Sequence, residues 1–182
     1  MQLITRKFNV NEYHKMAETG ILTPEDRVEL IKGEIIAMSP IGRKHAATVN
    51  RLNQLLCQKF YNKVIVSVQN SIRLDNYSEP QPDIVLLKPR SDFYESKIPE
   101  PEDIYLLIEV ADSTIKYDQD VKLPLYAESK ISEVWIVNLN NKTLEVYRQP
   151  QNKTYVEQKK NVQSISPIAF PETTLTINDI FS

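Results

Sequence analysis

Apolar residues recur at spacings of three and four in three parts of the chain, which is the pattern of a helix that buries one face. These segments are residues 9–19, 45–60 and 117–129. The second is the longest, with apolar residues at Ala46, Val49, Leu52, Leu55, Leu56 and Phe60. Pro124 interrupts the third. Because a proline inside a helix costs about 3 kcal/mol, we expect that helix to begin near Asp120 or to bend.

Alternating or continuous apolar runs predict strands in most of the remaining chain. A tight turn at Lys32-Gly33 joins two short runs into a hairpin. The predicted strands are 28–31, 34–38, 64–74, 84–87, 104–110, 134–137, 143–148 and 155–157, with one more in the tail 170–181. The run 104–110 is apolar almost throughout, as in a strand buried on both faces, and the proline-rich stretch 88–103 predicts a surface loop. This order of elements predicts a mixed α/β or α+β fold in a single domain, residues 1–182.

The bulk composition fits a globular protein with a packed core. Hydrophobic residues make up 41% and charged residues 25% of 182 residues, which is ordinary for that class. The first residues lack the apolar stretch of a signal peptide, and no apolar run approaches the ~20 residues of a membrane span. We therefore expect a cytoplasmic protein with no membrane contact. Cys57, the single cysteine, is expected to be a small buried residue of the long helix.

The net charge of −2 argues against a protein whose main task is tight, non-specific binding of nucleic acid through a basic face. A local basic cleft is compatible with this charge. Arg43, Lys44 and Arg51 could contribute to one, although a solvated helix surface is the commoner role for such residues.

Two carboxylates and one lysine stand at informative places in the predicted elements. Asp83 follows a proline where a strand begins, Glu109 ends the apolar run 104–110, and Lys122 lies in the third helix. Carboxylates supply hard oxygen ligands for a divalent cation, which neutralises a phosphate and acidifies water, and a nearby ammonium can orient that water. The set favours a metal-dependent phosphodiester hydrolase. A buried ion pair between Glu109 and Lys122 is the alternative, and spacing alone does not separate the two.

Five ordered segments of the chain form a recognisable set: 28–36, Met38-Ser39-Pro40 with His45, Pro82-Asp83, Ile108-Glu109-Val110, and 118–127 followed by 133–137. This set resembles the Uma-type restriction endonuclease family of the PD-(D/E)xK superfamily. The resemblance implies a restriction-endonuclease-like fold, with a central mixed β-sheet flanked by helices. It also implies that Asp83 and Glu109 hold Mg²⁺, or Mn²⁺ in its place, with the carbonyl of Val110 as a further ligand.

The chain departs from the superfamily pattern at one position. A lysine is expected two residues after the second acid, where this chain has Ala111. The resemblance suggests that Lys122 replaces it from the following helix, through its long side chain. It also suggests an extra acidic residue from the early part of the fold, for which Glu34 is the candidate, with a solvated hairpin glutamate as the alternative. His45 could contact phosphate or accept a proton, although solvation at a helix start is the default.

The leading hypothesis is a Mg²⁺-dependent endonuclease that cuts DNA, with Asp83, Glu109, Lys122 and Glu34 as catalytic residues. One alternative is a catalytically inactive module with the nuclease fold that serves in binding or assembly. A hydrolase of small phosphorylated compounds is a third hypothesis, which fits the low positive charge. We also expect a homodimer, because the C-terminal region is apolar and rich in strands and because cutting both strands of a duplex needs two sites. Trp135 and Tyr126 are expected to pack in the core.

Overall fold

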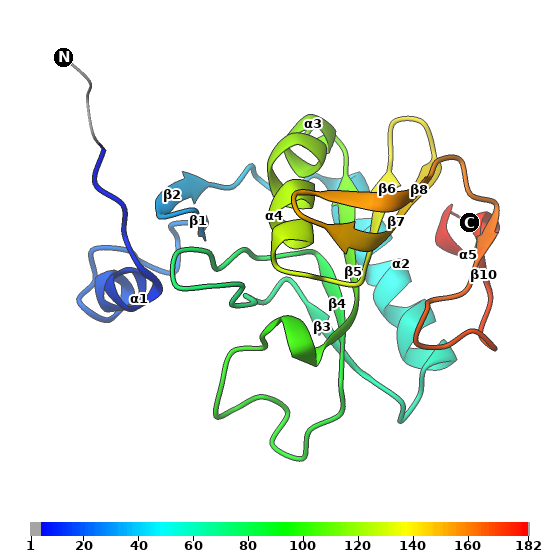
Figure 1. Ribbon diagram of the computed structural model, residues 1–182, viewed down its shortest axis with the longest axis horizontal. Helices are drawn as coiled ribbons and strands as arrows, with labels where there is room; N and C mark the ends of the chain where they lie inside the picture. Colours follow the sequence, from blue (N-terminus) through cyan, green and yellow to red (C-terminus); the bar gives the residue numbers. More distant parts are fainter. Residues whose placement is uncertain (1–4, 182) are drawn as a thin grey trace.

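A six-stranded mixed sheet forms the centre of the molecule (Figure 1). The structure is a computed structural model and describes residues 5–181. The strands, in their order across the sheet, are β3 (Ile65–Val68), β4 (Ile84–Leu87), β5 (Ile104–Ala111), β6 (Glu133–Asn138), β7 (Thr143–Gln151) and β8 (Thr154–Lys159). All neighbours are antiparallel except β5 and β6, which are parallel. The predicted mixed sheet flanked by helices is confirmed.

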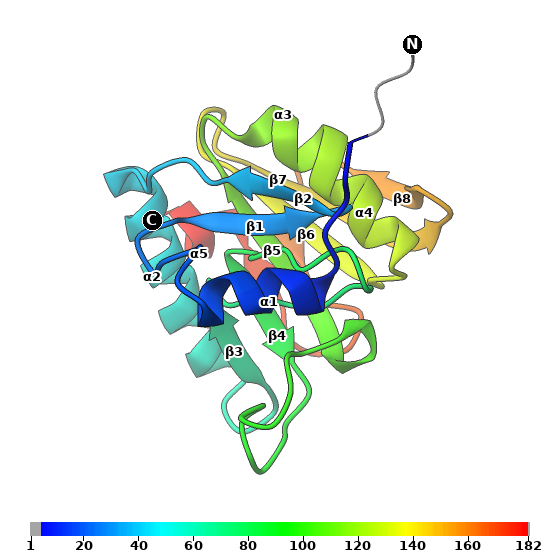
Figure 2. The ribbon, with the colours of Figure 1, turned by 90° about the vertical axis from the view of Figure 1, so that its left-hand side faces the viewer.

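Helices and a hairpin cover the two faces of this sheet (Figure 2). On one face pack α2 (Arg43–Lys59) and the C-terminal α5 (Ile177–Phe181). On the other pack α4 (Leu123–Glu128) and the hairpin of β1 (Val28–Ile31) and β2 (Glu34–Ala37). An apolar core lies on each face of the sheet, and β5 contributes to both. Its residues Ile108 and Val110 pack on the α2 side, and Leu107 and Ala111 pack on the α4 side. Glu109 therefore points toward α4.

The turn of the β1–β2 hairpin is the two-residue type that the Lys32-Gly33 pair predicts. Both residues have positive φ, 49° at Lys32 and 78° at Gly33, which gives the twist that suits a hairpin. A Cβ on Gly33 would lie 2.7 Å from the Cβ of Lys7, so this position has no room for a side chain. The N-terminal helix α1 (Val10–Glu18) follows shortly after Lys7 and begins with a capping box between Asn9 and Glu12.

The third predicted helix is three short pieces in the structure. It starts earlier than expected, with α3 (Ile115–Tyr117), and passes through a π-helical turn, η2 (Asp118–Lys122), into α4. In this turn the Leu123 N–H donates to the Asp118 carbonyl, five residues back. The wider turn places Pro124 in the first turn of α4, where a proline is tolerated because its missing N–H has no helical partner to lose.

Two expectations need correction, and a third is confirmed. The strand predicted over 64–74 ends at Val68, because Gln69 has a φ of 52° and leaves the extended conformation. Cys57 is exposed, because the buried side of α2 runs through Leu52 and Leu56, and Cys57 points to solvent. Trp135 and Tyr126 are buried as predicted.

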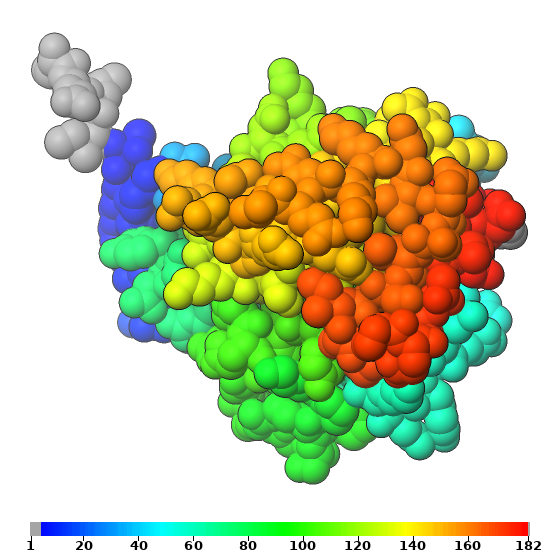
Figure 3. All heavy atoms as spheres, turned by 45° about the vertical axis from the view of Figure 1, so that its right-hand side comes forward, coloured from blue at the N-terminus to red at the C-terminus, as the bar shows by residue number. Residues whose placement is uncertain are grey.

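The C-terminal tail docks on α2, as Figure 3 shows for the red segment beside the cyan end of that helix. The one strand expected within 170–181 is β10 (Leu175–Thr176), and it pairs with β9 (Ser164–Ile165), a short strand just before the tail that was not predicted. A short 3₁₀ turn, η1 (Pro101–Asp103), leads from the predicted surface loop into β5. Among the described residues, no helix has both the length and the apolar character needed to cross a membrane.

Candidate active site

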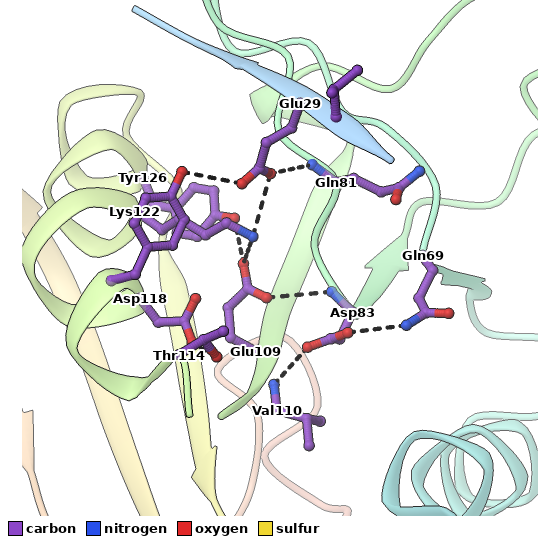
Figure 4. Close-up of polar contacts among 12 residues, drawn as sticks. Glu29, Gln69, Gln81, Asp83, Glu109, Val110, Thr114, Asp118, Lys122 and Tyr126 are labelled. Carbon is purple, nitrogen blue, oxygen red and sulfur yellow. Dashed lines mark hydrogen bonds and ion pairs between the residues drawn. The ribbon is translucent and has the colours of Figure 1, made fainter. Parts of the chain in front are cut away.

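Asp83 lies where the chain enters β4, and three donor groups contact its carboxylate; Figure 4 shows two of them, from Val110 and Gln69. The Val110 N–H donates to Oδ2 at 2.9 Å, and Gln69 Nε2 donates to Oδ1 at 3.3 Å. His45 Nε2, from the first turns of α2, is 3.1 Å from both oxygens. The Asp83 side chain is still 14% exposed. Its orientation is therefore fixed while one side stays open to solvent.

Glu109 is the neighbour of Asp83 across the sheet. Ile84 of β4 stands opposite Ile108 of β5 in an antiparallel pair. Asp83, which precedes Ile84, therefore lies beside Glu109, which follows Ile108. The Asp83 N–H donates to Glu109 Oε2 at 3.4 Å, while the other oxygen accepts from Tyr126 Oη at 2.5 Å. The Glu109 side chain is only 3% exposed. Two strand ends thus hold two carboxylates side by side.

Lys122 reaches this pair from η2. Its Nζ is 3.2 Å from Glu109 Oε1 and 3.4 Å from Glu29 Oε2. Ala111, the superfamily position for the lysine, lies two residues after Glu109 on the same face and is fully buried without a polar group. The ammonium thus lies beside the second acid from the helical side, in a buried ion pair with Glu109.

Glu29 of β1 joins the cluster through the buried side of the hairpin. It accepts hydrogen bonds from the Tyr117 hydroxyl and from the Gln81 N–H, both at 3.1 Å. With its side chain only 2% exposed, Glu29 is as buried as Glu109. Lys122 therefore lies between two buried carboxylates.

Burial and crowding of like charges perturb the acids. Burial raises the pKa of Glu109 to about 8; Lys122 works against this rise, and Asp118 and Asp83 add to it. Burial also raises the pKa of Asp118 to about 6. For Lys122, burial disfavours the ammonium, but the carboxylates of Glu109 and Glu29 outweigh this and raise its pKa above the ordinary value. The lysine is therefore a permanent positive charge.

A cavity of about 420 Å³ opens onto these groups. Five of the side chains that line it are carboxylates, namely Glu29, Asp83, Glu109, Asp112 and Asp118. Arg27, Lys122 and His45 are its basic residues. Acidic side chains therefore outnumber basic ones at the walls, and a bound divalent cation would relieve the crowding of carboxylates that raises the pKa values of Glu109 and Asp118.

The donor set fits a magnesium ion held by few protein ligands. Across residues 5–181, no three side chains of His, Cys, Asp or Glu are grouped so that they alone could hold a metal ion. Asp83 and Glu109 offer two adjacent carboxylates, and Mg²⁺ is commonly bound through one or two carboxylates while it keeps several waters. The residues present therefore suit Mg²⁺ better than a metal that requires a full protein cage.

The structure brings together three of the four predicted catalytic residues. Asp83, Glu109 and Lys122 share the cluster, whereas Glu34 does not reach it. Glu34 sits at the turn end of the hairpin, 55% exposed and paired with Lys7. Glu29, on the same hairpin, is instead the glutamate that is buried beside Lys122. His45 does reach the site, through Asp83.

Several other residues of the cluster were not predicted. Glu29 is the single polar residue in the strand Val28–Ile31, which is a signal that could have pointed to it. Asp118 is four residues before Lys122, a helical spacing that places both on one side. Tyr126 was expected only to pack, yet its hydroxyl donates to Glu109. No local pattern marks Gln69, whose left-handed backbone aims its amide at Asp83.

Fold and cluster together define a protein of the restriction-endonuclease-like class. The chain belongs to the Uma2 family, described as "Putative restriction endonuclease", whose sequence profile it matches over residues 10–178. A crystal structure described as a "putative nuclease belonging to DUF820" from Anabaena variabilis ATCC 29413 is similar to it, with a TM-score of 0.72 and 18% sequence identity. The similarity covers 96% of this chain and 97% of the other, and at this identity it shows the fold. A comparison with curated proteins gives no match.

Proposed function

We propose that this protein is a Mg²⁺-dependent endonuclease that hydrolyses phosphodiester bonds of DNA, with Mn²⁺ as an alternative cofactor. Membership of the restriction endonuclease family supports the reaction class. The observation that carries the proposal is the placement of the Lys122 ammonium 3.2 Å from Glu109 and on the same cavity as Asp83. This placement provides the two acids and the lysine that a phosphodiester hydrolase needs, although the methyl group of Ala111 cannot supply a charge.

Each residue has a distinct role in this proposal. Asp83 and Glu109 would hold the Mg²⁺, with the Val110 carbonyl as a further ligand. When bound, the ion supplies Lewis acidity and lowers the pKa of a water molecule. Lys122 keeps its proton, so it acts as a fixed charge that orients the attacking water and stabilises the charge that develops on the phosphate. Glu29 and Tyr126 hold Lys122 and Glu109 in place.

Cleavage of DNA with and without Mg²⁺ tests the proposal. The variants Asp83→Asn and Glu109→Gln keep the shape of each side chain but lose its charge, and we expect cleavage to fall by about 100-fold or more in each. Glu172→Gln, an exposed change beside Lys63 at the far end of α2, is the control and should cleave normally. Cleavage that survives both site substitutions would contradict the mechanism.

The same assay separates the rival functions. An inactive binding module would cleave neither DNA nor small phosphoesters at any Mg²⁺ concentration. A hydrolase of small phosphorylated compounds would act on nucleotides or sugar phosphates and spare DNA. The hydrolase of small phosphorylated compounds is the second candidate function, because the cavity volume of about 420 Å³ lies within the range of small-molecule sites.

The predicted homodimer stays a prediction. Size-exclusion chromatography with light scattering tests it directly. A single monomer peak at high protein concentration would remove it.

A further inference from the structure

The shape of the cavity bears on the form of nucleic acid that can reach the carboxylates. Glu109 and Lys122 are 3% and 8% exposed, so a phosphate has to enter the cavity to come near them. One wall is the hairpin with the segment that follows it, and the opposite wall is the turn after β5 with η2. In Figure 4 the Glu29 side chain descends from the hairpin toward Glu109, with η2 on one side and the start of β4 on the other. The reacting groups thus lie inside a pocket rather than along an open groove.

A paired duplex fits such a pocket poorly. Its phosphates run along the outside of a stiff cylinder, and its grooves, about 12 Å and 6 Å wide, accept protein elements rather than enter them. A strand outside a duplex can turn one phosphate inward, because its backbone torsions are free. A volume of about 420 Å³ is in the range of sites that enclose one small molecule, which suits one nucleotide of such a strand.

The cavity also has an apolar wall beside its acidic floor. Ile36, Met38 and Ile41 line it together with Pro40, and Ile41 is 43% exposed at the rim. An apolar wall can bind a base that has left its stack, because the exposed faces of that base can then pack against apolar side chains. In an intact duplex those faces are already covered by neighbouring bases. The wall therefore offers binding energy only to an unstacked nucleotide.

The charges of the cavity lining also favour a single strand over a duplex. Acidic side chains outnumber basic ones in the lining by five to three, so phosphate density in the ligand is costly. A duplex carries one negative charge per about 1.7 Å of axis, and a single strand about half of that. Arg43 and Lys44, exposed in the first turn of α2 beside the lining residue Gly42, offer a short basic edge. Two adjacent basic side chains can contact the phosphates of one strand.

We infer that the site acts on a nucleotide outside a duplex stack, in a single strand, a frayed end or a flap. The phosphate then lies at Asp83 and Glu109, and the base lies against Ile36, Met38 and Ile41. This inference rests on the proposed nuclease function and narrows its substrate class. It requires only one site for each cut, so it does not depend on a dimer.

Cleavage of three matched DNAs tests the inference: a single strand, the same sequence as a blunt duplex, and the duplex with a single-stranded flap. We expect the single strand and the flap to be cut about tenfold faster or more than the duplex interior, because extruding a nucleotide from a duplex costs unstacking free energy. Tenfold corresponds to about 1.4 kcal/mol. Equal or faster cleavage of the duplex overturns the inference but leaves the nuclease function standing.

Two further measurements keep the test decisive. Fluorescence anisotropy with Ca²⁺ in place of Mg²⁺ compares binding of the same DNAs without turnover, and tighter binding of the duplex overturns the inference even if no DNA is cut. Absence of any cleavage contradicts the proposed function instead.

Ile41→Ala should raise the KM for the single strand about threefold or more and leave kcat nearly unchanged, as expected for lost apolar contact. Ile168→Ala, a similarly exposed isoleucine outside the cavity, is the matched control; equal effects of the two variants contradict the assignment of the wall.

Discussion

Glu29 and Glu34 provide a matched pair of glutamates on one hairpin. Glu29 is buried between Lys122 and the Tyr117 hydroxyl, whereas Glu34 is exposed at the turn and pairs with Lys7. We expect Glu29→Gln to lower DNA cleavage about tenfold or more, because Lys122 loses one of the two charges that position it. Glu34→Gln should cleave normally, since exposed ion pairs contribute little. Chemical denaturation of both variants gives the stability control. Loss of cleavage in Glu34→Gln alone would restore Glu34 as the acidic residue of the site.

His45 lines the cavity and contacts the Asp83 carboxylate, and we propose that it acts on the site by orienting Asp83. Its Nε2 is one of the donors that orient the Asp83 carboxylate, and its Nδ1 is buried with no partner within the described part of the chain. Loss of a group that orients a metal ligand commonly costs 10–100-fold in metal affinity. We therefore expect His45→Ala to raise the Mg²⁺ concentration for half-maximal cleavage by about tenfold, with kcat at saturating Mg²⁺ largely kept. His45→Gln, which retains a donor, should recover part of the loss. An unchanged Mg²⁺ titration in His45→Ala would show that Asp83 is held without it.

At the scale of elements, the π-helical turn η2 sets the position of Lys122. Pro124 cannot donate a hydrogen bond, and in an ordinary helix its ring would clash with the Asp120 carbonyl. The wider turn avoids this clash and leaves both Asp118 and Lys122 facing the cavity. We expect Pro124→Ala to keep the stability within about 1 kcal/mol, since alanine has the best helix propensity. Cleavage should nevertheless fall, because an ordinary helical register would rotate Lys122 relative to Glu109. The free energy of unfolding and kcat, measured on the same preparation, check this; unchanged kcat would show that η2 does not depend on the proline.

Elements whose pattern is local were predictable from the sequence, and those set by tertiary contacts were not. The apolar spacing of α2 and the continuous run of β5 are properties of the segments themselves, so their positions agree with prediction within a few residues. The end of β3 depends on Gln69, whose left-handed backbone is fixed by contacts with Asp83 across the sheet. The choice between Glu29 and Glu34 depends on which end of the hairpin faces η2. Glu29 is the lone polar residue of its strand, but the orientation of the hairpin relative to η2 is a tertiary property that no local pattern carries.

The whole molecule divides its two sheet faces between packing and chemistry. The α2 face is filled by apolar side chains such as Leu52, Leu56 and Trp135. The α4 face has an apolar core as well, but Glu29, Glu109 and Asp118 are buried at its edge near a single lysine. Buried like charges destabilise a fold unless an opposite charge compensates them. The candidate site therefore weakens the native state in a way that a bound cation would reverse.

Thermal unfolding of the whole protein should accordingly respond to Mg²⁺. A ligand that binds only the folded state at 100 times its Kd adds about 2.7 kcal/mol, and for a chain of this size each kcal/mol raises Tm by about 2–4 °C. We therefore expect saturating Mg²⁺ to raise Tm by roughly 5–10 °C. The double variant Asp83→Asn with Glu109→Gln should lose this shift, because both proposed ligand charges are gone. An equal shift in the double variant would place the cation elsewhere on the molecule. No shift in the natural protein would contradict Mg²⁺ binding itself, and since this readout needs no substrate, it separates failure of the metal site from failure to find the right DNA.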